Sequence, residues 1–277
     1  MIFSIQTIQT SVAPLYEHPC TQSQRVDEVL YGMAVSVKAK ENDWLFVSTP
    51  YRYEGWIHYS NLIDAKLITR PSSQVYYVNI VAADVLVAPK VQAPLLVCLT
   101  LGCIVRTVDE IADEVDLSQE KSGWTKIYLV DGRIGYIRST FISQFPKSVS
   151  RESLCETAKL YLGTQYRWGG KTPLGIDCSG LCSMAYWLNG VVIYRDARIK
   201  PGFPIKKISP AYAQKGDLLF FPGHVGMMLD KTTMIHASEA NKVVKIESLT
   251  KEWIERLTEV GSLWSIGDKM EPIDHQY

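Results

Sequence analysis

The sequence has 277 residues, 47% of them hydrophobic, and its 29 basic and 29 acidic side chains give a formal net charge of zero. Such a chain can bury a large core, but it lacks the positive field that would hold a nucleic acid or an anionic membrane. No apolar run approaches the ~20 residues of a membrane span, and no basic residue precedes the apolar N-terminus as in a secretion signal, so we expect a cytoplasmic protein with six reduced cysteines.

An internal repeat fills the first half of the chain. Residues 44–62 align without a gap with residues 124–142, and residues 30–37 align with residues 100–107. The second copy is therefore longer by about ten residues, which fall in the acidic segment Asp109–Glu120. Each copy consists of short alternating apolar runs separated by turn residues, and this pattern predicts a small all-β barrel.

A polar stretch with a proline, residues 145–150, separates the repeat from a different kind of sequence. An amphipathic helix is predicted from Ser150 to Leu162, with Ser150 as its cap and Leu154, Ala158 and Leu162 on its buried face. Apolar runs later in the chain predict strands at residues 217–221, 224–229, 233–238, 243–246 and 263–266. Helices followed by strands predict an α+β domain with an antiparallel sheet.

Cys178 opens a second predicted helix. It follows the turn-rich run 168–175, and apolar residues recur at helical spacing from Leu181 to Leu188. A thiol in the first turn of a helix faces unpaired N–H groups and the positive end of the helix dipole, which favour the thiolate. The alternative is a small side chain that packs under the helix start, and Cys182, one turn further on, is interpreted in that way.

Two of the five histidines, His224 and His236, lie in consecutive predicted strands. A turn centred on Asp230 would place them directly opposite each other on one face of a hairpin. One imidazole could then act as a base toward the Cys178 thiol while the other orients it. A zinc site built from the same three side chains is the alternative, although no fourth ligand pattern accompanies them.

Five motifs in the second half stand in the order and spacing of the NlpC-type cell-wall cysteine peptidases: Tyr166–Gly170, Asp177–Leu181, Gly216–Phe221, His224–Gly226 and Ile235–Ala237. The resemblance implies a papain-like α+β catalytic domain in which helices pack on an antiparallel sheet. The two predicted barrels before it resemble bacterial SH3-type domains. The expected domains are 1–68 and 69–147, both SH3-type, and 148–277, the peptidase.

The resemblance also implies a set of site residues. Four would be catalytic: the nucleophile Cys178, the base His224, the orienting group His236 and the oxyanion donor Tyr166. Three would bind the free amine of an N-terminal L-alanine: Asp177, Ser179 and Tyr53. Considered alone, an aspartate in this position also fits a helix cap, and a tyrosine in a tight turn also fits a core aromatic.

The activity implied is hydrolysis of the γ-D-glutamyl-meso-diaminopimelate bond in peptidoglycan-derived peptides, as in murein peptide recycling, with no cofactor or metal. A peptide-binding module with a silent site and an acyltransferase using the same nucleophile are the alternatives. Relatives of this subgroup often have Pro-Arg-Asp-Ser after the catalytic helix, whereas here Ala197 lacks the hydroxyl and residues 198–215 add positive charge. The expected peptide length and protein partners therefore stay open.

Overall fold

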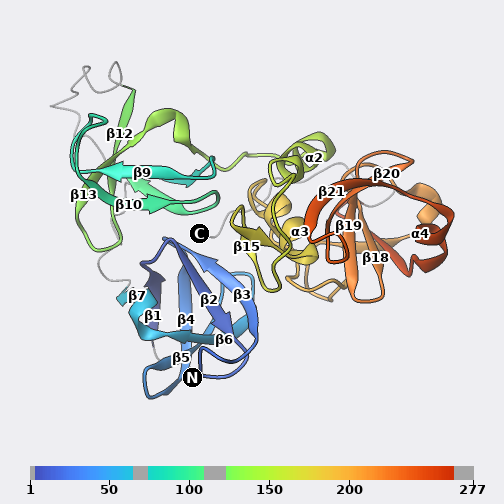
Figure 1. Ribbon diagram of the computed structural model, residues 1–277, viewed down its shortest axis with the longest axis horizontal. Coiled ribbons are helices and arrows are strands. Elements are labelled where there is room, and N and C mark those ends of the chain that lie inside the picture. The colour runs from blue at the N-terminus through green and yellow to red at the C-terminus, as the bar shows by residue number, and fades with distance from the viewer. Residues whose placement is uncertain (1–3, 65–73, 109–122, 265–277) are drawn as a thin grey trace. The chain divides into compact units, whose positions relative to one another are not determined.

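The computed structural model describes residues 4–64, 74–108 and 123–264, and the chain divides into two units, Met1–Gln144 and Phe145–Tyr277 (Figure 1). In the described ranges, no helix combines the length and apolar character that crossing a membrane requires. The predicted acidic insertion Asp109–Glu120 lies outside the described residues, as do residues 265–266 of the last predicted strand.

The N-terminal unit holds two antiparallel sheets of seven strands each, drawn in blue and green in Figure 1. The first contains β1 Ser4–Ile8, β2 Val12–Tyr16, β3 Arg25–Leu30, β4 Ala34–Glu41, β5 Trp44–Ser48, β6 Glu54–His58 and β7 Leu62–Asp64. The second contains β8 Val75–Val78, β9 Ala83–Leu86, β10 Leu95–Leu99, β11 Ile104–Thr107, β12 Trp124–Tyr128, β13 Ile134–Arg138 and β14 Ile142–Ser143. A short 3-10 helix precedes the last strand of each sheet: η1 Tyr59–Asn61 and η3 Ser139–Phe141.

The two sheets have the same strand order, β3-β2-β6-β5-β4-β1-β7 and β10-β9-β13-β12-β11-β8-β14. The strongest part of the sequence repeat coincides with equivalent strands, because β12 and β13 stand in the places of β5 and β6. Ile57 in β6 and Ile137 in β13 are both fully buried, as the alternation of apolar and polar residues predicts. The internal repeat of the sequence is therefore a repeat of the fold.

The C-terminal unit is built on a six-stranded antiparallel sheet in the order β17-β22-β18-β19-β20-β21. Its strands are β17 Lys206–Ile208, β18 Leu218–Phe221, β19 His224–Met228, β20 Thr233–Ser238, β21 Val243–Ser248 and β22 Glu259–Ser262. Almost every residue of β18, β19 and β20 is buried or nearly so. Helix α3, Cys178–Trp187, packs against β19 and β20 (Figure 1). An apolar cluster with residues of β18, β19, β20 and β22 includes Trp253 of helix α4, Lys251–Arg256.

The helices start where the sequence predicts. Ser150 caps α2, Arg151–Lys159, because its hydroxyl accepts a hydrogen bond from the Ser153 N–H at 3.0 Å. The Ser153 hydroxyl in turn accepts one from the Ser150 N–H at 3.1 Å. The prediction that this helix continues to a buried Leu162 is wrong, because α2 ends at Lys159 and Leu162 is 45% exposed. Helix α3, Cys178–Trp187, is confirmed.

The described part of the last predicted strand, residues 263–264, is not a strand. The chain forms helix α4, Lys251–Arg256, with Thr250 as its cap, and then returns through β22. Residues 263–264 lie after that strand. Ser262 at the end of β22 donates a hydrogen bond to the buried Asp217 carboxylate at 2.6 Å, so a polar pair inside the domain helps to fix the strand position. The small hairpin of β15 Lys171–Thr172 and β16 Gly175–Ile176 was also not predicted.

Candidate active site

Cys178 is the first residue of α3, as predicted. Asp177 caps the helix, because its Oδ1 accepts a hydrogen bond from the Gly180 N–H at 2.6 Å. The backbone N–H of Val225 is among the groups that lower the pKa of the Cys178 thiol, against the larger opposing effect of burial. Cys178 therefore lies near Val225, the residue that follows His224 in β19.

Gly180 lets the first turn of α3 pack closely on the preceding loop. A Cβ at this position would stand 2.3 Å from the Gly170 carbonyl oxygen and 2.9 Å from Asp177 Oδ1. Since neither the backbone oxygen nor the capping carboxylate can give way freely, only glycine fits here. The close contact holds the turn that carries Cys178 in place.

The two predicted histidines meet. His224 Nε2 and His236 Nδ1 are 2.9 Å apart, within hydrogen-bond distance, and the rings are nearly perpendicular at 81°. His236 is 1% exposed. The pairing that places one imidazole against the other is therefore present in the fold.

The predicted register of this hairpin is wrong by two residues. Met228 pairs with Met234 and Met227 with Ile235, so His224 and His236 are diagonal neighbours rather than directly opposed. Because side chains alternate with a period of two, an even shift leaves both rings on the same face. Gly226 occupies the place opposite His236, where a Cβ would lie 3.4 Å from the His236 Cβ, and leaves room for the rings to meet.

Two residues that the sequence analysis did not identify complete the surroundings of the imidazoles. Glu247 of β21 lies with its Oε2 2.9 Å from His236 Nε2. Trp253 of α4 packs on both rings, with centroid distances of 5.9 Å to His224 and 5.5 Å to His236. Trp253 thus packs against both imidazoles, and Glu247 is hydrogen-bonded to His236.

Burial dominates the electrostatics of the site. Burial, and after it the Asp177 carboxylate, raises the pKa of the Cys178 thiol to about 11. Burial, and after it the neighbouring His236, lowers the pKa of His224 to about 4. Both shifts favour the uncharged forms, a thiol at Cys178 and a neutral imidazole at His224, whereas the helix start alone favours a thiolate.

Alkylation tests this protonation state. We expect the rate constant for labelling of Cys178 by iodoacetamide to rise about tenfold per pH unit up to about pH 10, because only the thiolate reacts and its fraction grows in this way below the pKa. Peptide mapping separates this residue from Cys98, which is exposed. A rate constant that is flat between about pH 6 and 9 would instead indicate an ionised pair.

Tyr166 lies in the same region as Cys178. Burial, and after it the charges of Cys178, Asp177 and Glu239, raises the pKa of its phenol. Its backbone N–H donates to the Lys242 carbonyl at 2.8 Å, and the residue bridges to Ile176 just before the capping aspartate. A protonated phenol in this position is a hydrogen-bond donor.

Asp177 and Ser179 lie together and share a partner that was not predicted, Arg195. The guanidinium is 2% exposed and binds both oxygens of Asp177 at 2.9 Å and the Ser179 hydroxyl at 2.8 Å. The Gly169 N–H also donates to Asp177 Oδ2 at 2.9 Å. The aspartate is therefore a helix cap inside a buried ion pair, and any ligand amine would share its carboxylate with Arg195.

Tyr53 belongs to the N-terminal unit, where its backbone N–H donates to the Thr49 hydroxyl at 3.0 Å. Asp177 and Ser179 belong to the C-terminal unit, and a contact between them and Tyr53 stays a prediction.

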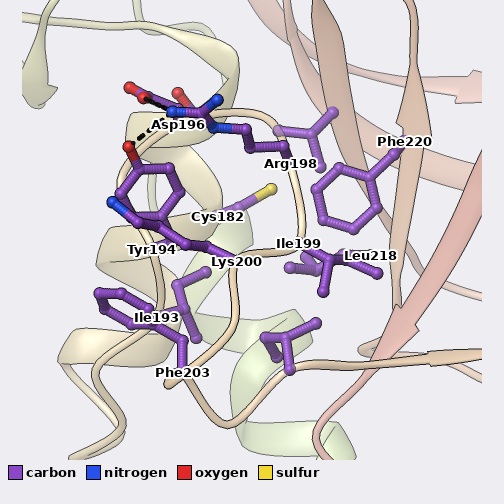
Figure 2. A pocket seen from close by; sticks show the side chains of 13 residues that line it. Cys182, Ile193, Tyr194, Asp196, Arg198, Ile199, Lys200, Phe203, Leu218 and Phe220 are labelled. Carbon is purple, nitrogen blue, oxygen red and sulfur yellow. Dashed lines mark hydrogen bonds and ion pairs between the residues drawn. The ribbon is translucent and has the colours of Figure 1, made fainter.

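A pocket of about 310 Å³, including its open mouth, is lined in part by Ser179 and Cys182 of α3 (Figure 2). Its wall consists of α3 residues, the segment after that helix and strands β18 and β19: Ser179, Cys182, Ile193, Tyr194, Asp196, Arg198, Ile199, Lys200, Phe203, Ile205, Leu218, Phe220 and Val225. Figure 2 shows Arg198 linked to Asp196 and to the Tyr194 hydroxyl, the latter at 3.0 Å. Lys200 Nζ lies 4.2 Å from the centre of the same ring. The pocket combines an apolar wall with two cations.

The imidazoles face each other instead of converging on a common point. Within the described ranges, no three His, Cys, Asp or Glu side chains are grouped so that they could hold a metal ion. His224 Nε2 and His236 Nδ1 are hydrogen-bonded to each other, so neither of these nitrogens is available to a metal ion. This arrangement does not match a zinc site built from Cys178, His224 and His236.

Comparison with known proteins identifies similar chains. The model of the NlpC/P60 family matches residues 163–262, and that of the bacterial SH3 domain matches residues 9–64. Dipeptidyl-peptidase 6 of Lysinibacillus sphaericus is 44% identical over 250 residues, which cover 87% of this chain and 90% of that protein. A gamma-D-glutamyl-L-lysine dipeptidyl-peptidase of Bacillus subtilis is 26% identical over 265 residues, covering 86% and 80%.

A solved structure shares the fold. An NlpC/P60 family protein from Bacillus cereus aligns with a TM-score of 0.78 at 20% identity, over 93% of this chain and 98% of that one. At this level of identity the likeness concerns the arrangement of the chain and leaves the substrate open.

Proposed function

Since the chain belongs to the NlpC/P60 family of cysteine peptidases, we propose that it removes L-alanyl-γ-D-glutamate from peptidoglycan peptides by cleaving the γ-D-glutamyl-meso-diaminopimelate bond. The observation that carries the proposal is the hydrogen bond of 2.9 Å between His224 and His236, beside a cysteine at a helix start. The dipeptidyl-peptidase names of the relatives support the removal of an N-terminal dipeptide.

The proposed mechanism starts from the neutral pair. His224 takes the proton of the Cys178 thiol as the sulfur attacks the γ-glutamyl carbonyl carbon. The Cys178 N–H and the Tyr166 hydroxyl donate to the oxyanion that forms. The protonated His224 then gives its proton to the departing amine as the C–N bond breaks, and water hydrolyses the thioester.

Recognition of the free N-terminus is assigned to Asp177 with Ser179 and Tyr53. The buried carboxylate supplies negative charge next to the nucleophile, although Arg195 compensates much of it. A substrate ammonium would share the Asp177 carboxylate with Arg195. It therefore needs further hydrogen-bond acceptors, which the hydroxyl groups of Ser179 and Tyr53 would supply. An acylated amine has no charge and adds bulk at the same point.

A substrate pair tests this preference. We expect L-Ala-γ-D-Glu-meso-diaminopimelate to be cleaved at least ~100-fold more efficiently, in kcat/KM, than its N-acetyl derivative, because a lost charged contact and a steric conflict add up. Chromatographic detection of the released diamino acid gives both values. Equal rates for the two peptides would remove the free-amine requirement while leaving the peptidase activity intact.

L-Lysine is a second candidate for the diamino acid that follows γ-D-glutamate in the substrate. The names of the relatives from Bacillus subtilis and Bacillus cereus specify L-lysine, so the L-lysine tripeptide is the matched alternative substrate for the same assay. We propose that the peptides are fragments released from the cell wall and recycled in the cytoplasm.

We further propose that both N-terminal sheets are SH3-type domains, over residues 1–68 and 69–147. The family model matches only the first of them. The identical strand order of the second sheet supports the same assignment there.

A further inference from the structure

We infer that Glu247 is a positioning residue of the catalytic site, which fixes the tautomers of His236 and His224 so that the basic nitrogen of His224 is the one free for the thiol. The inference rests on the proposed function only for its effect on turnover. The tautomers themselves are a property of the protein without substrate.

The first step is the hydrogen bond between Glu247 and His236. A carboxylate only accepts hydrogen bonds, so at 2.9 Å the His236 Nε2 must carry the hydrogen that it donates to Glu247 Oε2. A His236 with Nε2 unprotonated would set a lone pair against the carboxylate. In the neutral ring, Nδ1 of His236 is then the acceptor.

The second step carries the same logic to His224. Its Nε2 lies 2.9 Å from the His236 Nδ1 acceptor, so this nitrogen must be the donor. A neutral His224 then has its remaining lone pair on Nδ1, and this is the atom that can take the proton of Cys178. One carboxylate at the inner end thus determines which nitrogen is basic at the outer end.

The third step concerns charge. When His224 is protonated during the reaction, its Nε2–H bond to His236 transmits part of the positive charge toward Glu247. The groups that face the imidazole pair are Glu247 and Lys245 from β21 and Arg256 from α4. Of these, only the glutamate favours a proton on the pair, and the side chain of His236 is 2% exposed, so water screens the interaction little.

The register of β20 and β21 separates the effect of Glu247 on His236 from that of the neighbouring charge on Lys245. Glu247 stands opposite Met234 in the β20–β21 ladder, and His236 stands opposite Lys245. The carboxylate therefore reaches His236 diagonally, with Lys245 Nζ 3.4 Å from its other oxygen, Oε1. Lys245 is thus the matched control, because its removal leaves the bond between Glu247 and His236 in place.

Steady-state kinetics test the effect on turnover. We expect Glu247→Leu to lower kcat by about 10- to 100-fold with KM within about twofold, and Glu247→Gln, whose amide oxygen can accept the same hydrogen bond, to recover part of the loss. Burial lowers the pKa of His236 and the Glu247 carboxylate opposes this shift, so the acid limb of the pH profile should move to lower pH in both variants. It should move slightly to higher pH in Lys245→Met, because that ammonium lowers the same pKa.

Nitrogen chemical shifts of ¹⁵N-labelled histidine test the tautomers without any substrate. In the wild-type protein at neutral pH, we expect both His224 and His236 to carry hydrogen on Nε2, and in Glu247→Leu the His236 ring to become a mixture of tautomers. Hydrogen on Nδ1 of His236 in the wild type, or an unchanged pH profile and kcat in Glu247→Leu, would overturn the inference. A wild-type protein that shows the expected tautomers but cleaves neither tripeptide would instead refute the proposed function.

Discussion

Replacement of Cys178 by alanine is expected to abolish peptide hydrolysis, with kcat reduced by roughly 10⁴-fold or more, because the variant lacks the sulfur that is proposed to form the acyl intermediate. The residue is 6% exposed and small, so the fold should survive the loss of one sulfur atom. The measurement is release of the diamino acid from the tripeptide by the purified variant.

Cys182 provides the matched control. It lies one turn further along α3, is 1% exposed and lines the pocket. We expect Cys182→Ala to keep kcat within a few-fold of the wild type and to lose only about 1 kcal/mol of stability. Substantial activity in Cys178→Ala, or an equal loss in both variants, would contradict the assignment of the nucleophile.

Replacement of Arg195 by methionine is expected to lower the free energy of unfolding of the C-terminal unit by about 3–5 kcal/mol, because it leaves the Asp177 carboxylate buried without its counter-ion. The guanidinium bonds to both carboxylate oxygens and to Ser179, and its third partner, the Gly170 carbonyl, is 3.3 Å away. Calorimetry of the full chain measures the loss as a shift of the unfolding transition.

The control for this variant is Arg198→Met, three residues further along the chain. Arg198 is 65% exposed and pairs with Asp196 at 3.7 Å, so its ion pair is screened by water and should contribute less than about 1 kcal/mol. If the two variants unfolded at the same temperature, the buried pair would not be a major source of stability.

The positions of Cys178 and of the two histidines could be predicted because they follow local rules. An aspartate before a helical pattern predicts the α3 start that Cys178 occupies, and polar turn residues around Asp230 predict a hairpin. The exact register could not be predicted, because Asp230 accepts hydrogen bonds from Thr232 and Thr233 and so defines the turn through its own side chain. The predicted register differs from the observed one by two residues, an even number, so both histidines still lie on the same face of the sheet.

Glu247 and Arg195 could not be predicted, because their roles depend on partners that are distant in the sequence. In the sequence of β21, Lys245 and Glu247 alternate with Val244 and Ile246, which is the pattern of charges on a solvated strand face. Only the pairing with β20 brings it to His236. Arg195 follows a helix and would ordinarily be solvated, and its burial depends on the loop at Gly169 and Gly170 that folds over Asp177.

The raised pKa of Cys178 has a consequence for the life of the protein under oxidative stress. Peroxides attack the anionic form of sulfur, and the path to sulfenic, sulfinic and sulfonic acids begins there. With a raised pKa, Cys178 would offer little anion to such oxidants at neutral pH. The burial that is expected to slow its alkylation would therefore also slow its oxidation.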